Sequence, residues 1–197
     1  MKIGKVHKIV FFTSIATVVG VLLFYRARAS AAAKKWVNVG ENGVNASFTN
    51  SVFQEMMKKV GWKSGEAWCM YLAKAVHMDA FKKESANINS ILTGSTQTSW
   101  NNAKNDTTGT YKVVTSGNPQ KGDIAIWQNT SNPSTGHAGI VIGRSGETFK
   151  TVEGNTNLAG SSEGDKVLIK ERPLAYGEKI AGSNLKLLGF IRKKIKI

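Results

Sequence analysis

The chain has 197 residues, the length expected of one domain, and 41% of them are hydrophobic, which is enough for a sizeable core. It contains 27 Lys and Arg residues against 13 Asp and Glu, and the net charge of +14 favours an anionic partner such as nucleic acid, a membrane surface or a cell-wall polymer. A single cysteine excludes an intrachain disulfide framework and makes a zinc site built on cysteines implausible, so we expect neither a metal nor a cofactor.

The N-terminal segment has the order of a secretory signal. Residues 1–8 carry three lysines and no acid, residues 9–25 carry no charge, and small residues follow. The apolar run is slightly long for a signal and slightly short for a membrane span, so an uncleaved membrane anchor through residues 9–25 is the competing interpretation. Either way we expect export, to a secreted, periplasmic or membrane-anchored location. The chain should then have three parts: a signal or anchor over 1–32, a linker over 33–47 and one folded domain over 48–197.

Helical patterns occupy the first half of the expected domain. Asn50 or Ser51 can cap the first helix, and Gly61 can end it. The second helix is apolar over most of its girth, which indicates a central buried helix with Cys69 in its first turn. The expected helices share a helical spacing of apolar residues and cover 51–60, 66–81, 85–92 and 96–104.

Strand patterns occupy the second half, where apolar and β-branched residues lie between Gly, Asn and Pro breakers. The expected strands cover 111–114, 123–127, 136–143, 148–153, 167–170 and 187–192. Helices first and antiparallel strands afterwards predict an α+β domain. If the third and fourth of these strands form a hairpin, His137 at the start of one lies beside Glu153 and Asn155 at the end of the other.

These residues suit nucleophilic attack on an amide. A cysteine at a helix N-terminus faces the positive end of the helix dipole, which favours the thiolate, and the free N–H groups there can stabilise an oxyanion. His137 can take the proton of Cys69 and later protonate the leaving amine. Glu153 or Asn155 would then orient the imidazole, as in other catalytic triads.

Each signal also has a simpler interpretation. A lone cysteine on an apolar helix, such as Cys69, is usually a small core residue, and His137 alone would be unremarkable in a strand. Asp123 could orient the imidazole in place of Glu153, although a Gly-Asp pair before a strand is a common turn. His77 follows Cys69 by just over two helical turns, so it cannot reach the thiol and is expected to be structural.

Four short segments carry a family likeness: Trp68-Cys69, Lys121-Gly122-Asp123-Ile124, Gly136-His137-Ala138-Gly139-Ile140-Val141 and Val152-Glu153-Gly154-Asn155. Together they resemble the CHAP family of cysteine amidases and endopeptidases, which cut peptidoglycan on a papain-like α+β fold. The resemblance covers about residues 48–192. It implies that Cys69 is the nucleophile, His137 the base, Glu153 the third member of the triad and Asn155 a fourth polar partner.

One position departs from the family pattern. Many CHAP sequences have Gln immediately before the cysteine, whereas this chain has Trp68, as in the Trp-Cys branch of some phage lysins. No residue is therefore assigned a side-chain contribution to the oxyanion hole. Trp68 and Trp127 are candidates for substrate binding, and the alternative for Trp127 is a place in the core.

The resemblance predicts a peptidoglycan hydrolase that cleaves an amide of the stem peptide or cross-bridge, as an endolysin or in wall remodelling. Its expected partners are peptidoglycan and anionic cell-wall polymers. The alternatives are a catalytically inactive wall-binding module on the same fold and another papain-type cysteine peptidase. No nucleic-acid partner is expected, because no helix carries a basic stripe with base-reading side chains.

Overall fold

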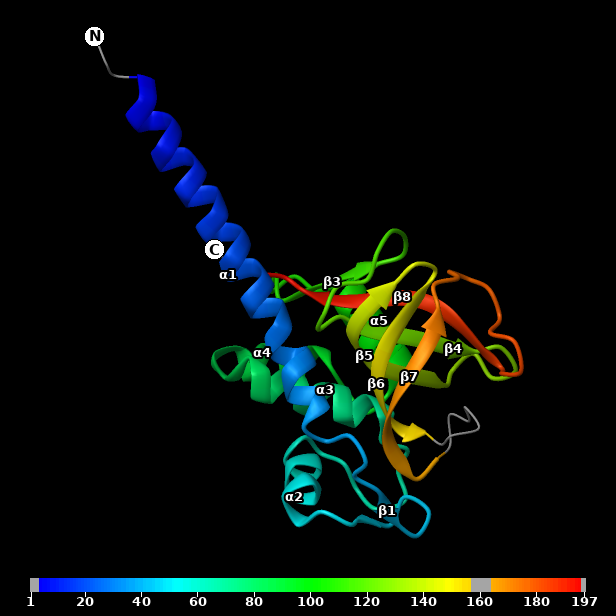
Figure 1. The fold of residues 1–197 in the computed structure, drawn as a ribbon. Helices are drawn as coiled ribbons and strands as arrows, with labels where there is room; N and C mark the ends of the chain where they lie inside the picture. The colour runs from blue at the N-terminus through cyan, green and yellow to red at the C-terminus, as the bar shows by residue number, and fades with distance from the viewer. Residues whose placement is uncertain (1–3, 157–163, 196–197) are drawn as a thin grey trace.

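The computed structural model describes residues 4–156 and 164–195, which form an α+β fold as predicted (Figure 1). The helices in this part of the chain are α1 (Gly4–Lys34), α2 (Ser51–Lys59), α3 (Cys69–Ala80), α4 (Ser85–Ile91) and α5 (Thr96–Lys104), with a 3-10 turn η1 (Lys82–Glu84). A short hairpin consists of β1 (Glu41–Asn42) and β2 (Ser47–Phe48). The main sheet consists of β3 (Tyr111–Val114), β4 (Ile124–Asn129), β5 (Gly136–Ser145), β6 (Thr148–Thr156), β7 (Lys166–Pro173) and β8 (Leu185–Lys193).

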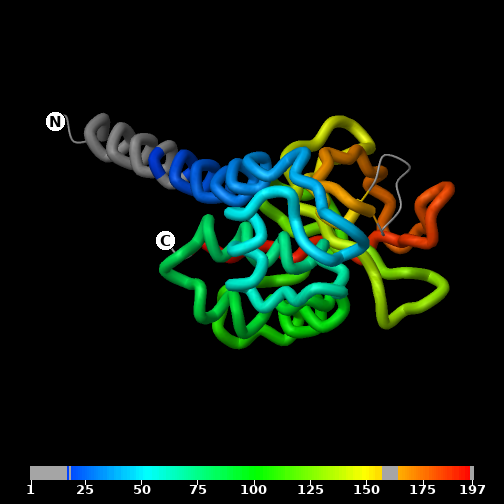
Figure 2. Tube along the Cα trace, turned by 90° about the horizontal axis from the view of Figure 1, so that it is seen from below, coloured from blue at the N-terminus to red at the C-terminus, as the bar shows by residue number. Residues whose placement is uncertain are grey.

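The strands of the main sheet follow the order β3-β8-β4-β5-β6-β7, and all neighbouring strands are antiparallel. Helices α3 and α5 pack on the main sheet, α2 and α4 pack against α3, and the C-terminal part of α1 runs beside α3 and β5 (Figure 1, Figure 2). Strand alternation places Ile126 and Ile140 in the core beneath the helices. Trp127 and Phe149 belong to a second apolar cluster on the opposite face, so the sheet is buried on both sides.

Most helix predictions are confirmed. The side chain of Asn50 accepts a hydrogen bond from the N–H of Phe53 and caps α2 as expected. Helix α3 begins at Cys69, later than the predicted start at Glu66, because Glu66 belongs to the preceding turn. There its carboxylate accepts hydrogen bonds from the Lys63 N–H and the Tyr71 hydroxyl, at 3.0 and 2.8 Å.

All six predicted strands of the main sheet are present, and several are longer than expected. Strand β6 continues through Asn155 to Thr156, and β7 continues from the predicted end at Lys170 to Pro173. The extension of β7 brings Arg172 into the sheet, where it lies opposite Phe149 of β6.

The C-terminal part of α1 packs into the domain. Tyr25 stacks on Phe81 with ring centroids 5.0 Å apart, and its hydroxyl donates to Glu84 at 2.9 Å. Ala29 and Ala33 are fully buried in the core where α1 meets α3 and β5. Residues before position 33 therefore contribute to the packing of the domain, which differs from the expected boundary. Within residues 4–156 and 164–195, none of the helices combines the length and the hydropathy that a membrane span requires.

The segment expected to be a linker, 33–47, is also packed. The N–H of Asn38 donates to the carbonyl of Val167, and the N–H of Val167 donates to the carbonyl of Val39, each at 2.8 Å. The segment then forms β1 and pairs with β2. A linker was expected because the segment has no period of its own; it is held instead by hydrogen bonds to residues outside it, including Val167 of β7, which is distant in the sequence.

Candidate active site

The hairpin of β5 and β6 forms as predicted and places a histidine beside a carboxylate. Gly139 pairs with Glu153 across the two strands, and His137 precedes Gly139 by two residues on the same face. The Nε2–H of His137 donates to Oε2 of Glu153 at 2.9 Å. Both side chains are fully buried, so this contact is shielded from water.

Cys69 lies at the start of a helix that packs on this hairpin. It is the first residue of α3, which packs against both β5 and β6, and its thiol is free and nearly buried. Cys69 is among the groups that raise the pKa of His137, which indicates that the thiol lies near the imidazole. Nδ1 of His137 is buried and has no hydrogen-bond partner among the described residues; catalytic hydrogen bonds are often long or poorly aligned until substrate binds.

The pKa of His137 reflects this position between two groups. Burial alone would lower it, because a charged imidazolium is poorly solvated in the interior. Hydrogen bonding and charge from Cys69 and Glu153 outweigh burial and raise the pKa of His137 to about 9. The arrangement therefore favours a protonated imidazole at neutral pH.

The carboxylate of Glu153 has two further partners that the sequence did not reveal. Thr151 donates through its hydroxyl to Oε1 at 2.5 Å, and Arg172 donates through Nε to Oε1 at 2.9 Å and through Nη2 to Oε2. Burial would raise the pKa of Glu153, but the hydrogen bonds and charges of Arg172 and His137 lower it to about 2. No local pattern distinguishes Arg172 from other strand-end cations, because its partner lies on a different strand.

Two glycines allow the close approach of these groups. A Cβ added to Gly139 would lie 2.7 Å from Cγ of Glu153 and 3.1 Å from Cβ of Thr151. A Cβ added to Gly154 would lie 2.4 Å from the ring of Trp68. The first glycine therefore admits the Glu153 side chain over β5, and the second lets the N-terminus of α3 pack on β6.

Asn155 lies two residues beyond Glu153 and is almost fully buried. Its backbone is left-handed, with a φ of 54°, a conformation that asparagine tolerates better than most residues. Its carbonyl accepts a hydrogen bond from the N–H of Gly164 at 3.1 Å. The pairing of β6 with β7 is irregular between Glu153 and Thr156, so Asn155 lies at a break in the ladder, which resumes where Thr156 pairs with Lys166.

The two tryptophans expected to bind substrate are fully buried. Trp68 donates through Nε1 to Glu41 at 2.9 Å and packs edge-on against Phe48. The ring of Trp127 lies 5.9 Å from that of His137 and stacks on Phe149 at 6.1 Å. Neither side chain is available to a substrate in this structure, so both are corrected to core residues. The ring of Trp127 also packs beside the imidazole of His137.

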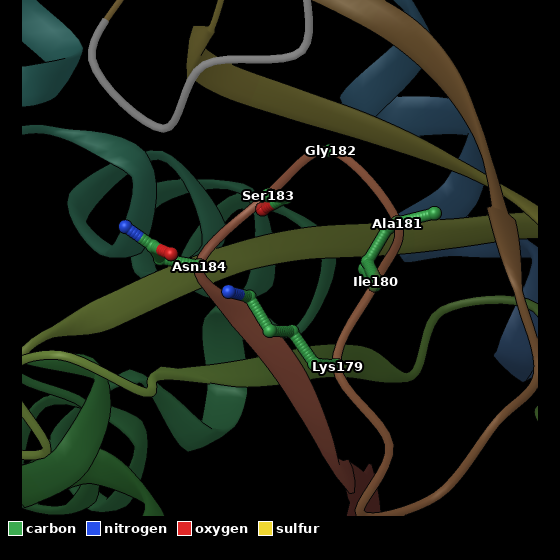
Figure 3. A pocket seen from close by; sticks show the side chains of 6 residues that line it. All are labelled: Lys179, Ile180, Ala181, Gly182, Ser183 and Asn184. Atoms are coloured by element: carbon green, nitrogen blue, oxygen red, sulfur yellow. The ribbon is translucent and has the colours of Figure 1, made fainter.

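A surface hollow of about 410 Å³ is formed by the loop that precedes β8, from Lys179 to Asn184 (Figure 3). The carbonyl of Asn184 accepts a hydrogen bond from the N–H of Thr130 at 2.7 Å, which ties this loop to the loop before His137. None of the candidate catalytic residues lines the hollow, so it is separate from the site.

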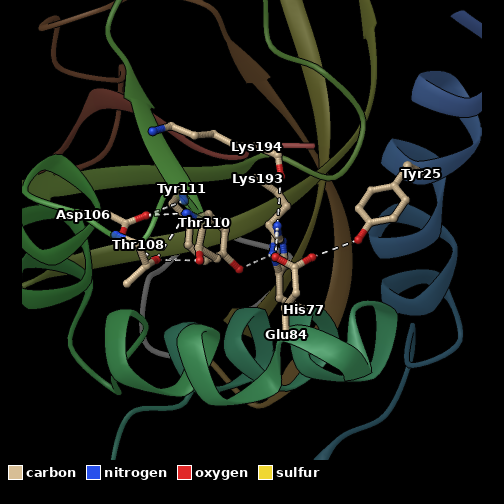
Figure 4. Close-up of polar contacts among 9 residues, drawn as sticks. All are labelled: Tyr25, His77, Glu84, Asp106, Thr108, Thr110, Tyr111, Lys193 and Lys194. Carbon is tan, nitrogen blue, oxygen red and sulfur yellow. Dashed lines mark hydrogen bonds and ion pairs between the residues drawn. The ribbon is translucent and has the colours of Figure 1, made fainter. Parts of the chain in front are cut away.

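Asp123 and His77, the other two residues considered from the sequence, lie outside the group formed by Glu153 and His137. Asp123 pairs with Arg192, whose Nε and Nη2 donate to its carboxylate at 3.0 and 2.7 Å, so the prediction that Asp123 could orient His137 is wrong. His77 lies with Nδ1 2.8 Å from the hydroxyl of Tyr111, in the polar network shown in Figure 4. Burial lowers the pKa of His77 to about 3, consistent with a neutral structural residue. Within the described part of the chain, no three His, Cys, Asp or Glu side chains are grouped as metal ligands would be.

Comparison with known families adds a finding that agrees with this geometry. The family model of the CHAP domain matches residues 59–155, a stretch that includes Cys69, His137, Glu153 and Asn155. The chain carries a CHAP domain. Its α+β arrangement is consistent with the papain-like fold of CHAP domains, which are typically cysteine amidases or peptidases acting on the cell wall. Searches of curated proteins and of solved structures found no match.

Proposed function

We propose that this CHAP domain hydrolyses an amide bond of peptidoglycan, in the stem peptide or the cross-bridge, with Cys69 as nucleophile, His137 as acid and base, and Glu153 as the orienting carboxylate. The observation that carries the proposal is the position of His137. One of its ring nitrogens is tied to Glu153, and the other has no hydrogen bond of ordinary geometry and is free to serve the thiol at the start of α3.

The first half of the reaction forms an acyl-enzyme. The thiolate of Cys69 attacks the amide carbonyl carbon, and the carbonyl electron pair moves to oxygen. The first N–H groups of α3 have no intrahelical partners, and Trp68 at the N-cap makes no side-chain cap bond, so these donors are suited to stabilise the oxyanion. His137 then gives its proton to the amide nitrogen as the C–N bond breaks.

The second half restores the enzyme. His137, now neutral, accepts a proton from water, and the resulting hydroxide attacks the thioester carbon. The C–S bond breaks, the thiolate of Cys69 is released beside the imidazolium, and the product leaves as a carboxylic acid. Glu153 holds Nε2 throughout, so Nδ1 stays on the side of the sulfur. Asn155 is retained as a fourth polar group beside the site.

The substrate class fits the charge of the chain and bears on its location. Its net charge of +14 favours approach to anionic wall polymers, and peptidoglycan lies outside the cytoplasmic membrane. Export directed by residues 1–32, with residues 9–25 as the apolar part of a signal or anchor, is therefore part of the proposal.

Substitution of the nucleophile tests the proposed function. Cys69→Ala and Cys69→Ser should lower the release of new ends from purified peptidoglycan by about a thousandfold or more while the melting temperature stays close to that of the parent protein. Mass spectrometry of the digest identifies the bond, because an amidase and an endopeptidase leave different ends. Undiminished release by both variants would overturn the proposal. Wall binding without release of any ends by the parent protein would favour the non-catalytic binding module instead.

A further inference from the structure

The carboxylate of Glu153 is saturated by hydrogen bonds. Oε1 accepts from Thr151 and from Nε of Arg172, while Oε2 accepts from His137 and from Nη2 of Arg172. An ionised carboxylate only accepts hydrogen bonds, so four donors around two oxygens fix both its charge and its orientation. The two bonds from Arg172 are the parallel pair that a guanidinium makes best.

Arg172 is itself held rigidly. Its side chain is 7% exposed, and its guanidinium carbon lies 5.5 Å from the centre of the Trp127 ring. That ring stacks on Phe149, the residue opposite Arg172 across β6 and β7. Glu153 lies four residues beyond Phe149 on β6, so the Arg172 side chain must extend along the strand to bond it. The packing leaves it little freedom to take another orientation.

Charge balance gives this contact a consequence for the reaction. When the thiolate of Cys69 and the imidazolium of His137 form, Glu153 and Arg172 add one negative and one positive charge, and the buried group is neutral. Without Arg172 the same group would carry a net negative charge away from water, which strongly favours uptake of a proton. The titratable and charged groups that face Glu153 are His137 of β5 and Arg172 of β7. His137 is in turn influenced by Cys69 of α3.

We propose that Arg172 is a positioning residue for the hydrolysis proposed above: it keeps Glu153 ionised and aligned, so that His137 presents Nδ1 to Cys69. This inference rests on the proposed function for its effect on catalysis, but its effect on the thiol can be measured without any substrate. A lysine would supply the charge at a single point and could not bond both carboxylate oxygens in parallel.

A second arginine in the sheet offers a matched control. Arg192 also binds a largely buried carboxylate, Asp123, through Nε and Nη2, with side-chain exposures of 12% and 3%. That pair makes no contact with His137 among those the structure describes. Loss of either arginine should destabilise the fold, but only loss of Arg172 should alter the titration of the catalytic pair.

The experiment compares Arg172→Met, Arg172→Lys and Arg192→Met with the parent protein. The readouts are the pH profile of Cys69 alkylation by iodoacetamide, kcat/KM on purified peptidoglycan, and the melting temperature. In Arg172→Met, Glu153 should take up a proton more readily, so the acid limb of alkylation should move to higher pH and kcat/KM should fall by about tenfold or more. Arg172→Lys should recover part of both, and Arg192→Met should lower the melting temperature with an unchanged alkylation profile.

Two outcomes would overturn the inference. One is an alkylation profile of Arg172→Met that coincides with that of Arg192→Met; the other is a kcat/KM for Arg172→Lys as low as that of Arg172→Met with no shift in the profile of either. If Arg172→Met does not fold, the lysine variant alone decides, since a role in stability only would leave its pH profile unchanged. Failure of the proposed function is separate: the parent protein would then release no ends, while its alkylation profile would still test Arg172.

Discussion

At the level of single residues, His137 and Glu153 each exist in a charged form that the other stabilises. The pKa of His137 is raised from 6.5 to about 9, so its contribution to stability is complete below pH 6.5 and is lost as the pH rises through about 9. The pKa of Glu153 is lowered from 4.5 to about 2, so its contribution is present above pH 4.5 and is lost as the pH falls through about 2. The pair therefore stabilises the fold most between pH 4.5 and 6.5.

The same pKa of His137 predicts the alkaline limit of activity. The imidazolium must protonate the leaving amine, so kcat/KM should fall as the pH rises through about 9. Glu153→Gln removes the charge that helps to hold this proton, and the alkaline limb should move at least one unit lower, with kcat/KM reduced by about tenfold or more at pH 8. The check is a pH–rate profile of the parent protein and of Glu153→Gln, measured at pH values where both are folded. An alkaline limb that stays in place would contradict the assignment of Glu153.

At the level of elements, the site depends on how closely β5, β6 and α3 approach one another. The hairpin turn between β5 and β6 sets the register that pairs Gly139 with Glu153. Gly139 has no side chain, and the space beside it is taken by Glu153 and Thr151. The strand pairing and the hydrogen bonds of the carboxylate therefore rely on the same position.

Gly139→Ala tests this dependence, and Gly143→Ala on the same strand is its control. The new methyl at position 139 would lie 2.7 Å from Cγ of Glu153, so the carboxylate must move away from His137. We expect a destabilisation of about 1–3 kcal/mol and a loss of most activity. A Cβ at Gly143 meets nothing within 4 Å, so that variant should keep both stability and activity. Urea unfolding and peptidoglycan digestion measure the difference, and equal behaviour of the two variants would be inconsistent with the packing described.

At the level of the whole molecule, α1 packs against the elements that carry the site. Its C-terminal part contacts α3, which begins at Cys69, and β5, which contains His137. Tyr25 links α1 to Glu84, which in turn accepts a hydrogen bond from Lys193 at 2.7 Å (Figure 4). The C-terminal part of α1, from Tyr25 onward, therefore helps to hold α3 and β5 in place.

Two truncations separate the parts of α1. Removal of residues 1–20 leaves Tyr25 and Ala29 in place, so the melting temperature should change little. Removal of residues 1–32 deletes both and uncovers Phe81, and should lower the melting temperature by on the order of 5 °C or more, together with activity. Calorimetry of the two proteins is the measurement. Equal melting temperatures would mean that the domain is complete without α1.

Local patterns in the sequence were sufficient for most of the fold. Breakers and apolar periods predicted the helices from α2 onward and the six main strands, because capping and alternation are properties of neighbouring residues. The short turn after β5 also predicted that His137 and Glu153 meet, since the register of a hairpin follows from its loop. The position of Cys69 at the start of α3 was visible for the same reason.

The tertiary structure decided what depends on residues far apart in the chain. Arg172 reaches Glu153 from a third strand, Trp127 is buried because β4 lies centrally in the sheet, and the segment 33–47 is held in part by hydrogen bonds to Val167 of β7. None of these contacts leaves a period or a spacing in the sequence. Neighbouring residues suffice to define which elements form and which hairpin joins the imidazole to its carboxylate. Only packing decided which other charges surround that carboxylate, because burial and long-range pairing belong to the assembled chain.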